Sequence, residues 1–243
     1  FDEYHDMTFG TPSRLPEVFF GDWFMRGAVN HGLPLNTVIS TRAAVALLGD
    51  DPRALSGAIL VCPVPDAGSA WDGALHAHLE RGGRALLYGP LAPAGDWLRR
   101  LLGVTIGAGL EGDLDLQTGA WDTAPGLSTC LRHHGLFGAG GMSEVPLGTG
   151  SGTALALASQ GGQVRAAALS AKTPAGGIVA WVRGTVACDP QRLGGHLLVP
   201  YDARQAFPAE MLMRQALGVL GWSIRHDKLH AGQPSPMLCI HRH

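Results

Sequence analysis

The sequence predicts an α/β protein with a mostly parallel sheet that is covered by helices on both faces. Three successive segments carry this prediction. Residues 58–64 (AILVCPV) form a continuous apolar run that is too short for a helix and lacks the alternation of a half-exposed strand. A helix-like segment follows, and residues 84–88 (RALLY) make a second short apolar run. A strand, a helix and a strand in this order form a βαβ unit with parallel strands.

The helix of this unit has clear start and stop signals in the sequence. Ser69 stands three residues before Asp72, the spacing at which a side chain satisfies free backbone N–H groups of a first helical turn. The pair Gly82-Gly83 supplies a left-handed stop. The apolar stripe that should face the sheet repeats every four residues and consists of Trp71, Leu75 and Leu79.

Strands and helices alternate through the rest of the first hundred residues. An aromatic-rich helix is expected over 16–32, a short strand over Leu35–Ser40 and a helix over 42–48, which Asp50-Asp51-Pro52 ends. Residues 96–102 read as another helix, with Gly103 as its C-cap. This alternation is typical of layered α/β domains.

The pattern changes to a period of two between residues 104 and 195, which we interpret as a β-rich insert. Residues 153–158 and 164–169 flank a glycine-containing loop and predict a hairpin, beside which 178–183 can pair. The glycine-rich run 138–152 lacks the G-K-[ST] ending of a phosphate loop and opens no helix, so we expect a loop without that chemistry. The expected α/β domain therefore comprises 1–103 and 196–243.

Helical and strand signals return after the insert. Residues 196–199 predict a short strand, 201–204 its exit loop and 208–220 a helix that Gly221 ends. The final segment, 237–243, alternates apolar and polar residues as a strand does. Because the chain begins at Phe1 and ends within this strand-like segment, we expect it to be a piece of a longer protein.

Composition limits the classes of function. The chain has 243 residues, 46% of them hydrophobic, and no apolar run as long as a membrane span, so we expect a cytoplasmic protein without a membrane partner. The net charge is −2 and the basic residues form no cluster, which argues against a nucleic-acid partner. The cysteines are single and outside any C-x-x-C spacing, so buried free thiols are expected at Cys62, Cys130, Cys188 and Cys239.

Three stretches of the chain resemble a known family when they are taken in order. They are GLPLNTVIS (32–40), SGAILVCPVPDAGSAWDGALHAHLERGGRALLYGPL (56–91) and HLLVPYDARQ (196–205). The succession is similar to a class I glutamine amidotransferase-like domain, and most similar to the one that follows the barrel in β-galactosidases, usually called the trimerisation domain. The resemblance covers residues 16–102 and 196–222 and implies a flavodoxin-like, three-layer fold. It implies either a homo-oligomer or contact with an adjacent catalytic domain.

The chain departs from that family at the amidotransferase nucleophile. Active members place a cysteine on a sharp turn of the G-x-C-x-G kind, where the thiolate meets a helix N-terminus and a histidine. Here the strand 84–88 is followed by Gly89-Pro90-Leu91, and Cys62 lies within its strand. Amidotransferase chemistry is therefore not expected.

A ligand site is predicted at the carboxyl edge of the sheet, because open α/β sheets bind ligands beyond the ends of their strands. The residues that follow the predicted strands carry two carboxylates, two guanidinium groups and two hydroxyls, and a helix N-terminus that suits an anion. Such a set suits a carbohydrate or a small acid. The alternative is that Asp66 and Asp202 make turn hydrogen bonds and the arginines pair with them. The set is Thr41, Arg42, Asp66, Ser69, Asp202 and Arg204.

Histidines and carboxylates also gather near both ends of the chain and in the insert. Adjacent His133 and His134 would point to opposite sides of a strand and are poor joint ligands, so surface histidines are expected, with no metal and no cofactor. His76 and His78 on the central helix are likewise expected at the surface. The other members of this group are Asp2, Glu3, His5, Asp6, His241 and His243.

Two functions follow from these observations. The first is a non-catalytic α/β domain of a carbohydrate-active protein, which serves assembly or completes a neighbouring active site. The alternative is a self-contained hydrolase that uses Asp66 or Asp202 with a histidine.

Overall fold

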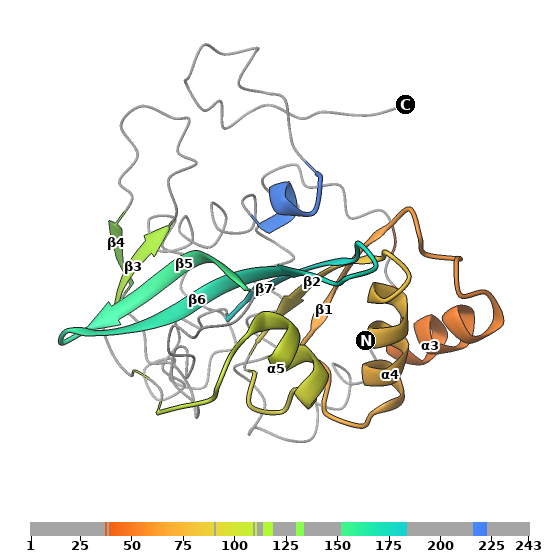
Figure 1. Cartoon of the computed structure of the whole chain (residues 1–243), viewed down its shortest axis with the longest axis horizontal. Coiled ribbons are helices and arrows are strands. Elements are labelled where there is room, and N and C mark those ends of the chain that lie inside the picture. The colour runs from red at the N-terminus through yellow and green to blue at the C-terminus, as the bar shows by residue number, and fades with distance from the viewer. Residues whose placement is uncertain are drawn as a thin grey trace, which may run out of the picture.

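The fold is an α/β architecture built on one mixed sheet (Figure 1). The computed structural model describes residues 37, 39–89, 91–108, 110, 152–183 and 216–222, together with the backbone of 114–118 and 130–133. Within these described residues, seven strands form the sheet in the order β1-β2-β7-β6-β5-β3-β4. The predicted α/β class is therefore confirmed.

The central βαβ unit forms as the sequence predicts. Strand β1 (Ile59–Pro63) and strand β2 (Arg84–Tyr88) pair in parallel, with Ile59 opposite Arg84, and helix α4 (Ala70–Leu79) connects them. The Ser69 hydroxyl accepts the Asp72 N–H (3.1 Å), which is the predicted N-terminal cap. Gly82 ends the helical region with a φ of 86°.

The flanking helices also match their predicted positions closely. Helix α3 (Thr41–Asp50) packs against α4 and ends at the predicted break, where the Asp51 side chain accepts the Arg53 N–H (2.9 Å). Helix α5 (Asp96–Leu102) ends at Gly103 in the left-handed conformation. The strand predicted over Leu35–Ser40 is not found at Thr37, Ile39 and Ser40, because Ser40 instead caps α3 by accepting the Ala43 N–H.

The strands expected in the 104–195 segment extend the same sheet. Strands β5 (Thr153–Gln160) and β6 (Gln163–Lys172) form the predicted hairpin, and Gly161 and Gly162 both have positive φ, as a two-residue type I′ turn requires. Strand β7 (Ile178–Val182) pairs antiparallel with β6 and parallel with β2, so it joins the hairpin to the βαβ unit. Strands β3 (Leu114–Thr118) and β4 (Cys130–His133) continue the sheet beyond β5.

Both faces of the parallel strands are covered, which gives three layers. On β2, Ala85 and Leu87 face one cluster and Leu86 and Tyr88 the other. Helices α4 and α5 fill the first cluster, and the helical segment 216–220 fills the second from the opposite face (Figure 1). The buried members contributed by the helices are Leu75, Leu79, Leu98 and Leu102 on one face, and Ala216, Leu217 and Leu220 on the other.

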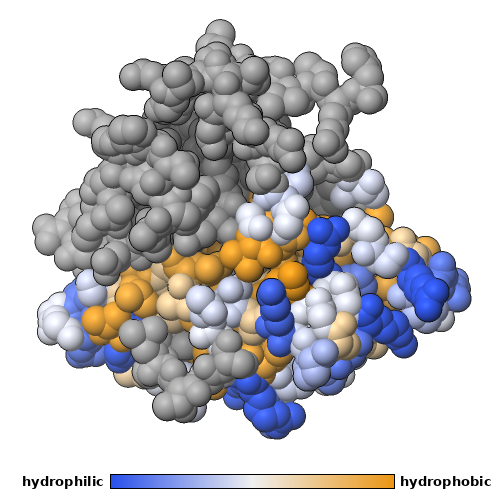
Figure 2. Space-filling view, turned by 45° about the horizontal axis from the view of Figure 1, so that its top comes forward, coloured by the Kyte–Doolittle hydropathy of each residue, from blue (hydrophilic) through white to orange (hydrophobic). Residues whose placement is uncertain are grey.

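The surface of the described part is mixed in character. Figure 2 shows apolar residues in a band across the middle of the view, with hydrophilic residues gathered towards its lower and right-hand sides. No helix in the described part of the chain combines the length and the apolar character needed to cross a bilayer. The predicted elements at 16–32, 196–204, 208–215 and 237–243 lie outside the described residues, and the division into domain and insert stays a prediction.

Arg84 links three segments at the amino end of β2, and its loss should weaken the fold. Its guanidinium donates to the carbonyl oxygens of Leu220 and Gly57, each at 3.0 Å. Leu220 ends the helical segment 216–220, which covers the face of the sheet opposite α4 and α5. Charge-assisted bonds of this kind stabilise by about 1–3 kcal/mol. We expect Arg84→Ala to lower the free energy of unfolding in urea by about that amount, and Arg84→Lys to recover only part of it, because an ammonium cannot span both carbonyls.

The control for this prediction is Arg81→Ala. Arg81 follows α4 and is exposed, and among the described residues its side chain bonds only the Ala77 carbonyl of α4 (3.2 Å), so we expect a loss of about 0.5 kcal/mol or less. Equal losses in the Arg84→Ala and Arg81→Ala variants would contradict a linking role for Arg84.

Candidate functional site

The predicted ligand site lies at the edge where the parallel strands end. Strands β1, β2 and β7 run in the same direction, so Pro63, Tyr88 and Val182 finish at one edge of the sheet. The loops that follow β1 and β2 lead into α4 and α5. Four of the six predicted ligand residues lie in the described part of the chain, whereas Asp202 and Arg204 lie outside it.

Asp66 and Ser69 share the short loop between β1 and α4. Asp66 is exposed, and its backbone carbonyl accepts the Ser69 N–H (3.1 Å). The Ser69 hydroxyl accepts from Asp72, but its own proton remains available to donate. The structure therefore brings together one exposed carboxylate and one hydroxyl donor.

Thr41 and Arg42 occupy the first turn of α3, whose cap is Ser40. Thr41 is partly exposed and Arg42 is exposed. Arg42 and Asp66 are both exposed to solvent, and among the described residues they form no ion pair with each other. Their joint use by a ligand stays a prediction.

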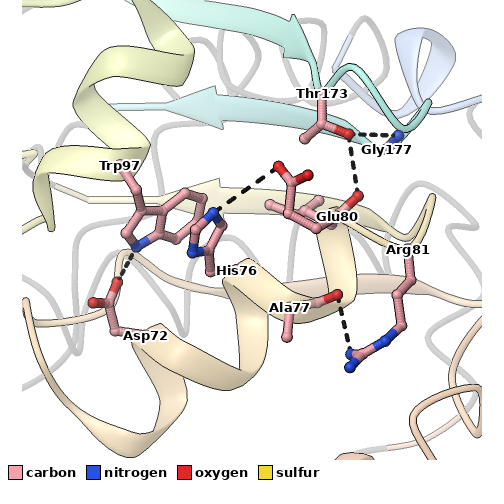
Figure 3. A network of polar contacts seen from close by, with 9 residues as sticks. Asp72, His76, Ala77, Glu80, Arg81, Trp97, Thr173 and Gly177 are labelled. Atoms are coloured by element: carbon pink, nitrogen blue, oxygen red, sulfur yellow. Dashed lines mark hydrogen bonds and ion pairs between the residues drawn. The ribbon is translucent and has the colours of Figure 1, made fainter.

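The N-terminus of α4 is already occupied by a carboxylate of its own helix. Asp72 is 7% exposed, and its Oδ2 accepts the Gly68 N–H (3.0 Å). Its Oδ1 accepts Nε1–H of Trp97 on α5 (2.7 Å), as Figure 3 shows. A carboxylate at this position also suits the positive end of the helix dipole. An external anion at this helix end would have to compete with Asp72, and the predicted anion site is weaker for that reason.

Trp97 connects α5 to α4 through a second contact. Its indole stacks on the ring of His76, with centroids 4.4 Å apart and planes 13° from parallel. His76 in turn lies 3.9 Å from the Glu80 carboxylate, and both side chains are half exposed (Figure 3). The sequence predicted Asp72 as part of a cap and placed Trp97 in the helix 96–102. It carried no signal that would pair them across 25 positions.

A third polar contact ties the end of α4 to the turn between β6 and β7. The Thr173 hydroxyl donates to the Leu79 carbonyl (3.2 Å) and accepts the Gly177 N–H (3.0 Å), and Thr173 is buried (Figure 3). A Cβ at Gly177 would collide with the Leu79 carbonyl, so the turn can approach the helix only without a side chain there. This turn lies at the amino edge of the sheet, opposite the predicted ligand site.

The expected surface position of His78 is wrong, whereas His76 is partly exposed as expected. His78 is 2% exposed, because the last turn of α4 places it beside Leu75 and Leu79 and against Gly83. Desolvation lowers the pKa of His78, an effect that a hydrogen bond with the Arg84 backbone partly offsets and the charge of Arg81 reinforces.

The turn that follows β2 begins with a glycine, and its sequence Gly89-Pro90-Leu91 contains no cysteine. Gly89 follows β2 with a φ of 102°, its N–H donates to the Val182 carbonyl (3.1 Å), and its carbonyl accepts Nε1–H of buried Trp181 (2.8 Å). Cys62 lies inside β1. Burial raises the pKa of the Cys62 thiol to about 12, which a hydrogen bond with the Trp71 side chain partly offsets. Cys62 is therefore a poor nucleophile at neutral pH.

The side chains described form no evident metal centre. No three His, Cys, Asp or Glu among the described residues stand close enough to share a metal ion. His133 belongs to β4 by its backbone, and the remaining members of the predicted histidine and carboxylate group lie outside the described residues.

Comparison with known proteins finds likeness only among solved structures. No family model and no curated protein matches the sequence. Three similar structures are a cold-adapted β-galactosidase from Rahnella sp. R3 (15% identity, TM-score 0.47), a β-galactosidase from Bacillus circulans sp. alkalophilus (14%, 0.47) and a GH42 β-galactosidase from G. stearothermophilus carrying a catalytic mutation (11%, 0.48). The matches cover 80%, 82% and 83% of this chain and 26%, 27% and 26% of those chains. The chain thus spans about a quarter of the length of the structures it matches.

The bond between Asp72 and Trp97 should stabilise the fold measurably. Asp72→Asn keeps the shape of the side chain but replaces one acceptor oxygen by an amide, so either the Gly68 N–H or the Trp97 indole loses its partner. We expect the free energy of unfolding to fall by about 1–3 kcal/mol. A double-mutant cycle with Trp97→Phe in urea titrations should show a coupling energy of about 1 kcal/mol or more.

The matched control for this cycle is Glu80→Gln on the same helix. The contact between Glu80 and His76 is exposed, so its loss should cost about 0.5 kcal/mol or less. Additive effects of the Asp72→Asn and Trp97→Phe variants would show that the two helices are held together by apolar packing alone.

Cys62 should resist alkylation in the folded protein. A pKa of about 12 leaves far less thiolate at pH 8 than an ordinary thiol has, so we expect iodoacetamide to modify Cys62 at least about a hundredfold more slowly than in the urea-unfolded chain. Peptide mapping by mass spectrometry separates this residue from the other cysteines. Rapid modification of folded protein at pH 7 would mean that the thiol is accessible and ionised.

Proposed function

We propose that this chain is a non-catalytic, amidotransferase-like α/β domain of a glycoside hydrolase-like protein that acts on carbohydrate. In this proposal the domain serves assembly or completes an active site that a neighbouring domain or subunit provides. Its partners are a second copy of the chain or an adjacent catalytic domain, and neither nucleic acid nor a membrane.

The observation that carries the proposal is the chemistry of the turn after β2. The sequence resembles an amidotransferase-like domain in the order of its elements, and the turn where that family holds its thiol contains Gly89. Two hydrogen bonds join this turn to β7, so Gly89 is part of the connection between strands. Cys62 does not substitute for the missing nucleophile, because burial keeps its thiol protonated at neutral pH.

The charges at the carboxyl edge suit binding better than catalysis. Asp66 is exposed and Asp72 is committed to Gly68 and Trp97, so the described loop offers one carboxylate rather than the pair that glycoside hydrolysis uses. We propose that a carbohydrate hydroxyl or a polar group of a partner meets Thr41, Arg42, Asp66 and Ser69, with Asp202 and Arg204 as further members of the set.

The outer face of α3 supports a role in assembly. Leu47 is 40% exposed and lies on one side of α3 with exposed Ala43 and Ala46, and Ile39, which is 42% exposed, lies just before the N-cap Ser40. Their opposite side, with Ala44 and Leu48, is buried against the rest of the domain. A helix that is apolar on two sides suits a contact with a second copy of this chain, and we place that contact on Ile39, Ala43, Ala46 and Leu47.

Two measurements test the proposal. They are light scattering coupled to size exclusion and a screen for hydrolysis of nitrophenyl glycosides. We expect a species heavier than a monomer and no hydrolysis by this chain. Leu47→Lys should weaken self-association at least about tenfold, because it places a charge where a leucine would be buried. The control is Val164→Lys on the β5–β6 hairpin, where a similarly exposed valine (39%) lies outside the proposed contact.

A monomer that hydrolyses a glycoside by itself would overturn the proposal. If such turnover disappeared in the Asp66→Ala variant, the chain would be a hydrolase that uses this carboxylate. Equal weakening of self-association by Leu47→Lys and Val164→Lys would reject α3 as the contact.

A further inference from the structure

We propose that His78 is an acid-sensitive latch. Its protonation opens the corner between α4 and β2 (residues 80–83) and releases the turn between β6 and β7 (residues 173–177). This inference is independent of the function proposed above. It rests on how the imidazole is enclosed and on the chain of hydrogen bonds that begins at Gly83.

The His78 ring is closed in on the side of Nε2. Among the described residues that buried nitrogen has no hydrogen-bond partner, whereas the ring makes its hydrogen bond with the Arg84 backbone. A Cβ placed on Gly83 would collide with Nε2 and Cδ2 of the ring, so Gly83 packs closely on this edge. Protonation at Nε2 would create an N–H donor that has no acceptor among these residues.

The charged groups around the ring do not compensate for a positive charge. Arg81 is the charged group that acts on His78, and it is a cation. The guanidinium of Arg84 is bound to Leu220 and Gly57. The turn from Thr173 to Gly177 contributes a hydroxyl and no ionised side chain, while α3, which packs on α4, carries Arg42 and Asp50 at exposed positions. Among the described residues, a protonated imidazole would therefore lie buried without a counter-ion.

Gly83 connects the His78 imidazole to the start of β7 and to the turn between β6 and β7. Its N–H donates to the His78 carbonyl (3.0 Å), and its carbonyl accepts the N–H of Ile178, the first residue of β7 (3.0 Å). The neighbouring Gly177 bonds Thr173, which bonds the Leu79 carbonyl at the end of α4. The end of α4, Gly83 and the turn 173–177 are thus joined in a continuous circuit of hydrogen bonds. Movement of His78 away from Gly83 breaks this circuit at the closely packed contact between these two residues.

The direction of the pH effect follows from linkage. Because the pKa of His78 is lowered in the folded state, the latch is fully effective above the pKa of an unfolded histidine, about 6.5, and its contribution is lost as the pH falls below that value. When the pH falls from 7.5 to 5.0, the population of the open form relative to the closed form should rise at most about 30-fold. Protonation of the free imidazole sets this limit.

Amide hydrogen exchange measured by NMR tests the latch in the intact chain. After correction for the intrinsic rate at each pH, we expect opening at the Gly83 and Gly177 amides to rise about tenfold or more from pH 7.5 to pH 5.0. The Trp222 amide, bonded to Leu217 on the opposite face of the sheet, should be unchanged. The His76→Gln variant should behave as the wild type does, and the His78→Gln variant should show no pH dependence at Gly83 or Gly177.

Two further measurements keep the test decisive if His78→Gln fails to fold. The ring resonances of His78 in the wild-type protein should titrate below the ordinary histidine pKa of about 6.5, and Gly83→Ala should open the same two amides already at pH 7.5. An equal rise of exchange in His78→Gln, or titration of His78 without any change at Gly83, would overturn the proposal.

Discussion

The structure depends on the burial of β2 on both of its faces. The strand is five residues long, and four of its side chains are buried in two different clusters. Helices α4 and α5 must therefore cover one face while the segment 216–220 covers the other. At the amino end of the strand, Arg84 bonds the carbonyl oxygen of Leu220 on the face that the segment 216–220 covers. Strands β6 and β7 also contribute buried side chains to both clusters.

The local elements could be predicted from the sequence because their signals are local. Ser69 and Asp72 cap α4, Gly103 ends α5, and the glycine pair 161–162 turns the hairpin, each within a few residues of the element it bounds. The pairing of β2 with β7 could not be predicted in the same way. Both strands are apolar runs without alternation, and nothing in such a run specifies which neighbour it will take.

The candidate site was only partly predictable for a similar reason. Asp66 and Ser69 follow a predicted strand, so their position at the edge of the sheet follows from topology. Asp72 was identified as a cap, but its contact with Trp97 depends on the angle at which α5 meets α4, which spacing along the chain does not reveal. His78 was misplaced because a polar residue near a helix end is ordinarily exposed. Here the absence of a side chain at Gly83 provides the space that the imidazole occupies.

The late position of β7 in the chain has a consequence for how the protein folds. Arg84 of β2 pairs with Ile178 of β7, so these parallel strands can pair only after the long segment between them has folded back. Short turns, in contrast, join β5 to β6 and β6 to β7. Contacts between distant residues cost more chain entropy to form than those of a hairpin. We therefore expect the antiparallel meander to assemble early and the βαβ unit to dock onto β7 afterwards. During synthesis, the edge of β2 that pairs with β7 would stay without this partner until residues 178–182 leave the ribosome.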